Sequence, residues 1–126
     1  MASRSIAVLI LDDEVEFRNL LADYLADEGC FEVHTAGTAP EAQAILDATA
    51  IDVCLADLRL RGGDGFVFAE EARARHPAVR FLIHTGSSLG DVRERARASG
   101  FPQDRILLKP LTLAAIVRAI QEAAGR

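Results

Sequence analysis

Short apolar runs alternate with longer amphipathic segments along the whole chain. The short runs are typical of strands, and the longer segments repeat apolar residues at helical spacing. The runs predict strands at residues 6–11, 31–36, 51–57, 79–85 and 105–109. The longer segments predict helices at 14–28, 66–75 and 91–99, and two more that begin at 38–41 and after Thr112. Residues 31–36 alternate between apolar and polar types, so we expect this strand near an edge of the sheet.

The predicted helices carry boundary signals and apolar stripes. Gly29 stands where a glycine ends a helix, and Thr38 to Glu41 form a capping box with an early proline. Thr112 is expected to cap the last helix. The stripe of the first helix is Phe17, Leu20, Leu21, Tyr24 and Leu25, and that of the last is Leu113, Ile116, Val117 and Ile120.

The alternation of strands and helices indicates the fold class. Five strand–helix units in about 120 residues predict an α/β fold, with a parallel sheet covered by helices on both faces. The crossovers are expected to be right-handed. Folds of this kind bind ligands outside the carboxyl ends of the strands, where the strand order switches.

Composition agrees with one globular domain. The chain has 126 residues, of which 50% are hydrophobic and 26% are charged, and its net charge is −5. An acidic balance argues against a nucleic-acid surface, and no apolar run reaches the 18 or so residues of a membrane span. We therefore expect a single domain over residues 1–126, ordered from about 5 to 124, with no output domain and no signal peptide.

The chain contains two cysteines, Cys30 and Cys54. Neither belongs to a Cys-x-x-Cys or a Cys/His cluster, which argues against metal ligation. A disulfide stays open, but one pair in a well-filled domain favours two reduced, core-like thiols and a cytosolic location.

Polar residues with complementary chemistry follow the predicted strands. Asp12 and Asp13 end the first strand, Asp57 the third, Thr85 the fourth and Lys109 the fifth. Each has an ordinary explanation by itself, such as an acid at a helix start or a turn residue. Because the carboxyl ends of parallel strands meet at one edge, we expect three carboxylates, a hydroxyl and an ammonium to converge there.

The converging residues suit phosphoryl transfer to a carboxylate. Clustered carboxylates require a counter-charge, and oxygen ligands favour a hard cation such as Mg²⁺. A carboxylate can form an aspartyl phosphate, while the cation and Lys109 would neutralise the phosphoryl charge. Thr85 could donate its hydroxyl to a phosphate oxygen. The three histidines, His34, His76 and His84, are scattered in the sequence, and we expect structural or surface roles for them.

The order of these motifs resembles the receiver domain of bacterial two-component response regulators. The matching features are "DD" after the first strand, "D" ending the third, "DG" opening the third helix, "T-G" after the fourth strand and "KP" after the fifth. The resemblance covers about residues 5–124. It implies a flavodoxin-like, doubly wound five-stranded sheet of order 2-1-3-4-5 in a three-layer αβα sandwich.

The resemblance also implies roles for individual residues. Asp57 would be the phosphoacceptor, and Thr85 and Lys109 would contact the phosphoryl group. Mg²⁺ or Mn²⁺ would be bound directly by Asp13 and Asp57, through water by Asp12, and by the carbonyl of Arg59. Gly65 would be a turn glycine suited to positive φ, and the bond before Pro110 is expected to be cis.

The implied function is signalling rather than that of a separate enzyme. A histidine kinase or phosphotransfer protein would donate the phosphoryl group, and phosphorylation would shift the domain between inactive and active states. A downstream protein, or an output domain in a longer parent chain, would read the face of the fourth helix, fifth strand and fifth helix, through which a dimer could also form. The location would be cytoplasmic, with no membrane or nucleic acid bound by this domain.

Three features depart from the resemblance, and one is Arg59, two residues after Asp57, which we expect to alter the lifetime of the phosphoryl group. Ile106 replaces the aromatic residue usual three positions before the lysine, which keeps open a pseudo-receiver that binds a partner without phosphorylation. The 100–109 segment is about two residues longer than expected, so Phe101 or Pro102 could form a distinct contact beside the output face.

An aspartyl-phosphate phosphohydrolase is disfavoured because no Asp-x-Asp follows the first strand. An FMN protein is disfavoured because acids there would repel the phosphate.

Overall fold

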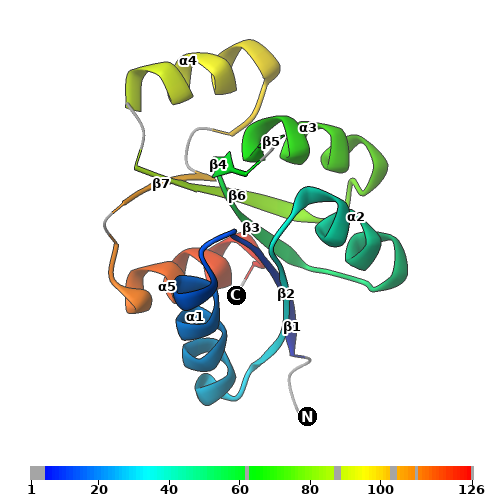
Figure 1. Cartoon of the computed structure of the whole chain (residues 1–126), viewed down its shortest axis with the longest axis vertical. Helices are drawn as coiled ribbons and strands as arrows, with labels where there is room; N and C mark the ends of the chain where they lie inside the picture. Colours follow the sequence, from blue (N-terminus) through cyan, green and yellow to red (C-terminus); the bar gives the residue numbers. More distant parts are fainter. Residues whose placement is uncertain (1–4, 62, 87–88, 103–104, 110, 126) are drawn as a thin grey trace.

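A five-stranded parallel sheet forms the centre of the molecule in the computed structural model, which describes residues 5–61, 63–86, 89–102, 105–109 and 111–125 (Figure 1). The sheet order is β2-β1-β3-β6-β7, which confirms the predicted order 2-1-3-4-5 because β6 and β7 are its fourth and fifth strands. The sheet strands are β1 (Ile6–Leu11), β2 (Phe31–Ala36), β3 (Val53–Asp57), β6 (Arg80–Thr85) and β7 (Ile106–Leu108). The helices are α1 (Val15–Glu28), α2 (Ala39–Ala48), α3 (Gly65–Arg75), α4 (Leu89–Ser99) and α5 (Leu113–Ala123).

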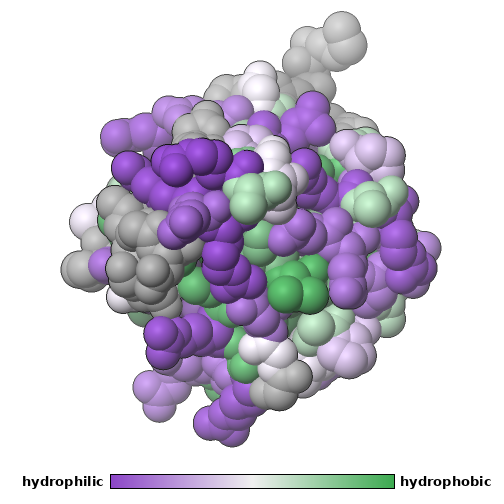
Figure 2. Space-filling view, turned by 90° about the horizontal axis from the view of Figure 1, so that it is seen from above, coloured by the Kyte–Doolittle hydropathy of each residue, from purple (hydrophilic) through white to green (hydrophobic). Residues whose placement is uncertain are grey.

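Helices cover both faces of the sheet, so the molecule has the predicted three layers (Figure 1). One apolar cluster joins the sheet to α2, α3 and α4, and includes Leu46, Phe66 and Val92. A second cluster joins the opposite face to α1 and α5, and includes Leu25 and Ile116. The outer surface over α2, α3 and α4 is mainly hydrophilic, with small apolar areas between the polar side chains (Figure 2).

The apolar runs explain which strands are central. All six residues of β1 are buried, because this strand has neighbours on both sides and helices on both faces. β2 lies at the edge of the sheet, as predicted, and all its residues except Ala36 are exposed or only partly buried. The predicted caps are also confirmed: Gly29 ends α1 with φ of 79°, and the hydroxyls of Thr38 and Thr112 accept hydrogen bonds from Glu41 N–H and Ala115 N–H.

The stripe predicted for α1 was partly wrong. Leu21 and Leu25 are fully buried, but Leu20 is 56% exposed. Ala22 packs against the core instead. The buried side of α1 is therefore rotated away from Leu20, because α1 packs over β1 and β2 at the side of the sheet rather than over its middle.

Several element boundaries differ from the predicted ones. Residues 58–65, for which no strand or helix was predicted, contain a short antiparallel pair, β4 (Arg59–Leu60) and β5 (Gly63–Asp64). β3 and β7 are shorter than predicted, and α4 begins two residues earlier. The two short strands are too short for a periodic signal in the sequence, so only tertiary packing reveals them.

Both cysteines are free, as predicted. Cys54 lies in the core, where burial raises the pKa of its thiol. The expectation of two core-like thiols was wrong for Cys30, which is exposed in the turn between α1 and β2. Of the described helices, none is long and apolar enough to cross a membrane.

Candidate functional site

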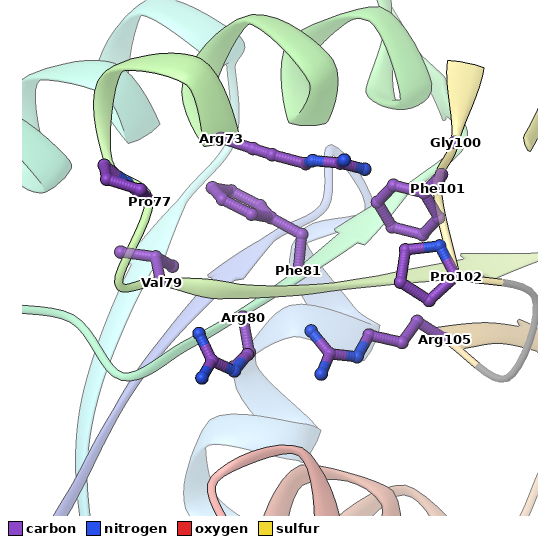
Figure 3. A pocket seen from close by; sticks show the side chains of 9 residues that line it. All are labelled: Arg73, Pro77, Val79, Arg80, Phe81, Gly100, Phe101, Pro102 and Arg105. Carbon is purple, nitrogen blue, oxygen red and sulfur yellow. The ribbon is translucent and has the colours of Figure 1, made fainter.

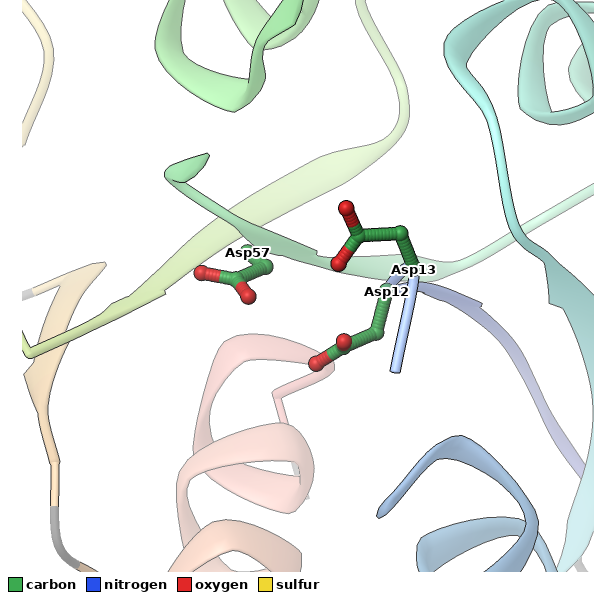
Figure 4. A group of neighbouring side chains, drawn as sticks. All are labelled: Asp12, Asp13 and Asp57. Carbon is green, nitrogen blue, oxygen red and sulfur yellow. The ribbon is translucent and has the colours of Figure 1, made fainter. Parts of the chain in front are cut away.

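The predicted site residues converge at the carboxyl ends of β1, β3, β6 and β7. A cavity of about 320 Å³ at this edge is lined by Asp13, Glu14, Asp57, Arg59, Thr85, Gly86 and Lys109. The carboxylates of Asp12, Asp13 and Asp57 each offer an oxygen within 4.8 Å of the others, and those of Asp12 and Asp13 extend toward the side on which Asp57 lies (Figure 4). The structure thus brings together all five polar residues predicted at the strand ends.

Backbone hydrogen bonds hold the two acids that follow β1. Asp12 is buried, and its Oδ1 accepts a hydrogen bond of 2.9 Å from Glu14 N–H at the start of α1. Asp13 Oδ2 accepts a bond of 2.8 Å from Arg61 N–H in the β4–β5 turn. The short strand pair therefore positions Asp13 from the far side of the cavity, a role that no local sequence signal indicates.

Arg18 is a second supporting residue that sequence reasoning missed. Its Nη1 donates a hydrogen bond of 2.9 Å to the carbonyl of Asp12. A Cβ on Gly37 would lie 2.6 Å from the same Nη1, so a glycine at that position leaves space for the guanidinium. Arg18 and Gly37 together fix the turn that carries Asp12 and Asp13.

Asp57 lies between a cation and backbone donors. Its Oδ2 is 3.2 Å from Lys109 Nζ, and its Oδ1 accepts a bond of 3.3 Å from Arg59 N–H. Lys109 is the only lysine in the chain. Its own N–H donates to the Thr85 carbonyl at 2.7 Å, which couples the ends of β6 and β7. The chain's one lysine ammonium group therefore contacts the carboxylate of the candidate phosphoacceptor.

Thr85 is buried and lines the cavity, whereas Ile106 is half-buried and packs against the α2–α3–α4 side of the core. Ile106 pairs with Ile83 across the β6–β7 register. A branched aliphatic side chain in this position has less freedom to turn than an aromatic ring on a single Cβ.

The metal-ligand role of the Arg59 carbonyl stays a prediction, and Pro110 lies outside the described residues.

Gly65 is required for a different reason than predicted. Positive φ occurs at Gly29, Gly100 and Gly125 among the described glycines, so the expectation of positive φ at Gly65 was wrong. A Cβ at Gly65 would instead overlap the backbone carbonyl oxygen of Asp57. Gly65 N–H also donates a bond of 2.7 Å to the Leu58 carbonyl. Close contact between the start of α3 and the end of β3 is what excludes a side chain here.

The three histidines have separate environments. His76 contacts Asp47 at 3.0 Å on the surface, and His34 lies 3.5 Å from Glu32. His84 is buried next to the site, with its ring 5.5 Å from that of Phe17. Burial and the nearby charge of Lys109 lower the pKa of His84 to about 4, so its imidazole is neutral at pH 7. The sequence did not indicate that His84 borders the site.

The contact expected from the 100–109 segment lies elsewhere than predicted. Phe101 is buried in the core, with its ring 5.5 Å from that of Phe66 and beneath the guanidinium of Arg73 on α3. It therefore anchors the segment after α4 against α3 rather than forming a surface contact beside α4 and α5.

The electrostatics of Asp12 lead to a prediction about the metal-free protein. Burial, opposed by the Glu14 N–H and reinforced by the charge of Asp57, raises the pKa of Asp12 from 3.8 to about 6. The carboxyl group of Asp12 therefore binds its proton more tightly in the folded state than in the unfolded state. Protonation of Asp12 stabilises the fold fully below about pH 4, and this contribution is lost as the pH rises through about 6. We expect Asp12→Asn to raise the free energy of unfolding at pH 7.5 by about 1–3 kcal/mol, because asparagine is uncharged.

Urea denaturation of the metal-free protein between pH 4 and 7.5 measures this effect. The gain from Asp12→Asn should shrink toward pH 4, where the aspartate is already protonated. A gain of equal size at every pH would show that the charge of Asp12 is not its cause.

Comparison with known proteins finds a family model and curated relatives that match most of this chain. The family model of the response regulator receiver domain matches residues 8–121. The chain is 35% identical over 109 residues to the transcriptional regulatory protein AruR of Pseudomonas aeruginosa, which covers 82% of this chain and 43% of AruR. It is 32% identical over 119 residues to the transcriptional regulatory protein PdtaR of Mycobacterium tuberculosis, which covers 94% of this chain and 57% of PdtaR. The chain thus spans about half the length of these two curated relatives.

Solved structures show the same fold. A crystal structure of a response regulator protein from Burkholderia pseudomallei, with a phosphorylated aspartic acid, a calcium ion and citrate, matches with a TM-score of 0.82 and 26% identity. The match covers 96% of this chain and 69% of that one.

Proposed function

Because this chain belongs to the response regulator receiver domain family, we propose that Asp57 is its phosphoacceptor. The observation that carries the proposal is the place of the Asp57 carboxylate, between two further carboxylates and the ammonium of Lys109 in an open cavity. The Burkholderia pseudomallei relative, described with a phosphorylated aspartic acid, supports the same chemistry here.

The transfer step requires an anionic oxygen and a donor with a good leaving group. Asp57 supplies the attacking oxygen, which forms an O–P bond as the N–P bond of a phosphohistidine breaks and its imidazole leaves with the electron pair. Lys109, 3.2 Å from Asp57, offsets the negative charge brought by the phosphoryl group. The Thr85 hydroxyl, which lines the same cavity, would bind a phosphoryl oxygen afterwards.

The three carboxylates fit a divalent cation. Their oxygens lie close enough to share one hard cation, and Asp12 and Asp57 are buried, where unneutralised charge is costly. Asp13 and Asp57 would bind Mg²⁺ or Mn²⁺ directly, together with the Arg59 carbonyl, and Asp12 through water. When bound, the cation would lower the repulsion between Asp57 and the incoming phosphoryl group.

The partners follow from the same proposal. The donor would be a histidine kinase or phosphotransfer protein in the bacterial cytoplasm, and the phosphorylated state would be read through α4, β7 and α5. AruR and PdtaR are longer than this chain and are named transcriptional regulatory proteins, which supports an output domain or a downstream protein as the reader. We propose that the domain acts as a signalling switch rather than as a separate enzyme, and that a dimer would use the same face.

Phosphorylation by a small donor tests the phosphoacceptor. Incubation with Mg²⁺ and acetyl phosphate should add one phosphoryl mass to the protein, and Asp57→Asn should abolish the addition, because the amide oxygen is a much weaker nucleophile. Intact-protein mass spectrometry measures both, and Asp27→Asn on the exposed side of α1 is the matched control.

The opposite outcome would favour the pseudo-receiver, a binding module that is not phosphorylated. The complete set of acids, Thr85 and Lys109 counts against that function, although Ile106 departs from the usual aromatic. A folded protein that gains no phosphoryl group from acetyl phosphate or from its kinase would exclude the phosphoacceptor role.

A further inference from the structure

A second cavity lies at the opposite edge of the sheet from the carboxylates. Its volume is about 500 Å³, within the range of small-molecule sites. It is formed by the amino ends of β6 and β7, the last turn of α3 and residues 100–102 at the end of α4 (Figure 3). Neither the motifs of the receiver family nor the proposed phosphorylation uses this part of the molecule.

The lining of this cavity is strongly basic. Nine described residues line it; three of them are arginines, Arg73, Arg80 and Arg105, and none of these nine is acidic. The whole chain has a net charge of −5, so the cavity has the opposite sign to the protein that contains it. Guanidinium groups gathered around one cavity repel one another and attract an anion, and their planar donors match phosphate oxygens.

One nitrogen of the Arg73 guanidinium has no hydrogen-bond partner among the described residues. Its guanidinium carbon lies 5.3 Å from the centre of the Phe101 ring, so the ring covers one face of the group. Its Nη1 is buried and has no hydrogen-bond partner within the described part of the chain. An unpaired buried N–H of a cation is costly, and a small rotation toward the adjacent cavity would let an anion relieve that cost.

The arrangement favours an extended anion over a single phosphate. Figure 3 shows the guanidinium groups of Arg80 and Arg105 on one side of β6, while that of Arg73 lies on the other side, near Phe101. Phe81 and Phe101 are 2% and 3% exposed, so they form a rigid wall but offer no free ring for stacking. Recognition of the ligand would therefore depend on its negative charge rather than on stacking of an aromatic ring.

We propose that this cavity binds a small anion with two or more linked phosphate groups. Arg80 and Arg105 bind one end, and Arg73 binds the other. The ligand would join α3, the start of β6 and the segment after α4.

The test is a titration followed by two-dimensional NMR of the ¹⁵N-labelled protein without divalent cations. Pyrophosphate and ADP are two sources of a diphosphate, inorganic phosphate is the shorter anion, and adenosine is the uncharged control. We expect saturable shifts of the Arg80, Phe81, Phe101 and Arg105 amides with both diphosphates, weaker binding of phosphate and none of adenosine. Added salt should weaken the binding.

Variants separate the cavity from general charge. The double variant Arg80→Gln/Arg105→Gln should raise the Kd for pyrophosphate about tenfold or more, because two charge-assisted contacts are lost. Arg118→Gln, on the exposed side of α5, should leave the Kd for pyrophosphate within about twofold of its original value. These surface changes keep the core intact, which circular dichroism checks.

Three results would overturn the proposal. One is the absence of saturable shifts up to about 10 mM pyrophosphate. Another is a set of shifts confined to Thr85, Gly86 and Lys109, which would place the anion at the carboxylate site. The third is a Kd for pyrophosphate that the double variant Arg80→Gln/Arg105→Gln leaves within about twofold of its original value.

Discussion

Replacing Gly65 with alanine is expected to lower the free energy of unfolding by about 2–4 kcal/mol, in the upper range of the costs of overpacking. The new Cβ would overlap the carbonyl oxygen of Asp57 and lie 2.8 Å from its carbonyl carbon. These are backbone atoms, so no side chain can rotate to make room. Relief requires the start of α3 or the end of β3 to move, and the end of β3 carries Asp57.

Gly63→Ala is the matched control for this prediction. Gly63 lies two residues away in the same turn region, and a Cβ there would meet nothing within 4 Å. Urea denaturation should show a change of about 0.5 kcal/mol or less for Gly63→Ala. Equal losses for the two variants would show that close contact with Asp57 does not explain the glycine at position 65.

Replacing Lys109 with glutamine is expected to slow phosphorylation of Asp57 by acetyl phosphate about 100-fold, a typical loss when a group that stabilises developing charge is removed. The ammonium lies 3.2 Å from Asp57 Oδ2, and Lys109 is the only lysine in the chain. Mass spectrometry at successive times measures the rate. Lys109→Arg, which keeps the charge, should lose less.

Affinity for Mg²⁺ distinguishes this effect from damage to the fold. Lys109→Gln removes a positive charge beside three carboxylates, so binding of Mg²⁺ should become tighter while phosphorylation becomes slower. If the substitution distorted the site instead, binding of Mg²⁺ would become weaker and phosphorylation would become slower. If Lys109→Gln were phosphorylated at a rate within about twofold of that of the wild-type protein, the proposed role of Lys109 would be excluded.

Local patterns were enough to predict the architecture and the site. The all-apolar 6–11 run becomes the buried strand β1 because a strand with neighbours and helices on every side must be apolar throughout. Asp12, Asp13, Asp57, Thr85 and Lys109 could be assigned to one site although they are far apart in sequence. The reason is that parallel strands place all their carboxyl ends at one edge.

Features that depend on contacts between distant segments could not be predicted in this way. The exposure of Leu20 reflects how α1 packs on the sheet, and the burial of Phe101 reflects a space left under α3. The hairpin that positions Asp13 contains only two residues in each strand, too few for a recognisable period.

The sequence by itself determined the order of the five helices and of the five strands of the main sheet, and which chemical groups meet at its carboxyl edge, because both follow from periodicity and from the direction of parallel strands. Only the tertiary structure decided the reason for Gly65, the support of Asp12 by Arg18, and the gathering of Arg73, Arg80 and Arg105 around one cavity. These depend on the distances between segments far apart in the chain, which packing sets and a linear pattern does not contain.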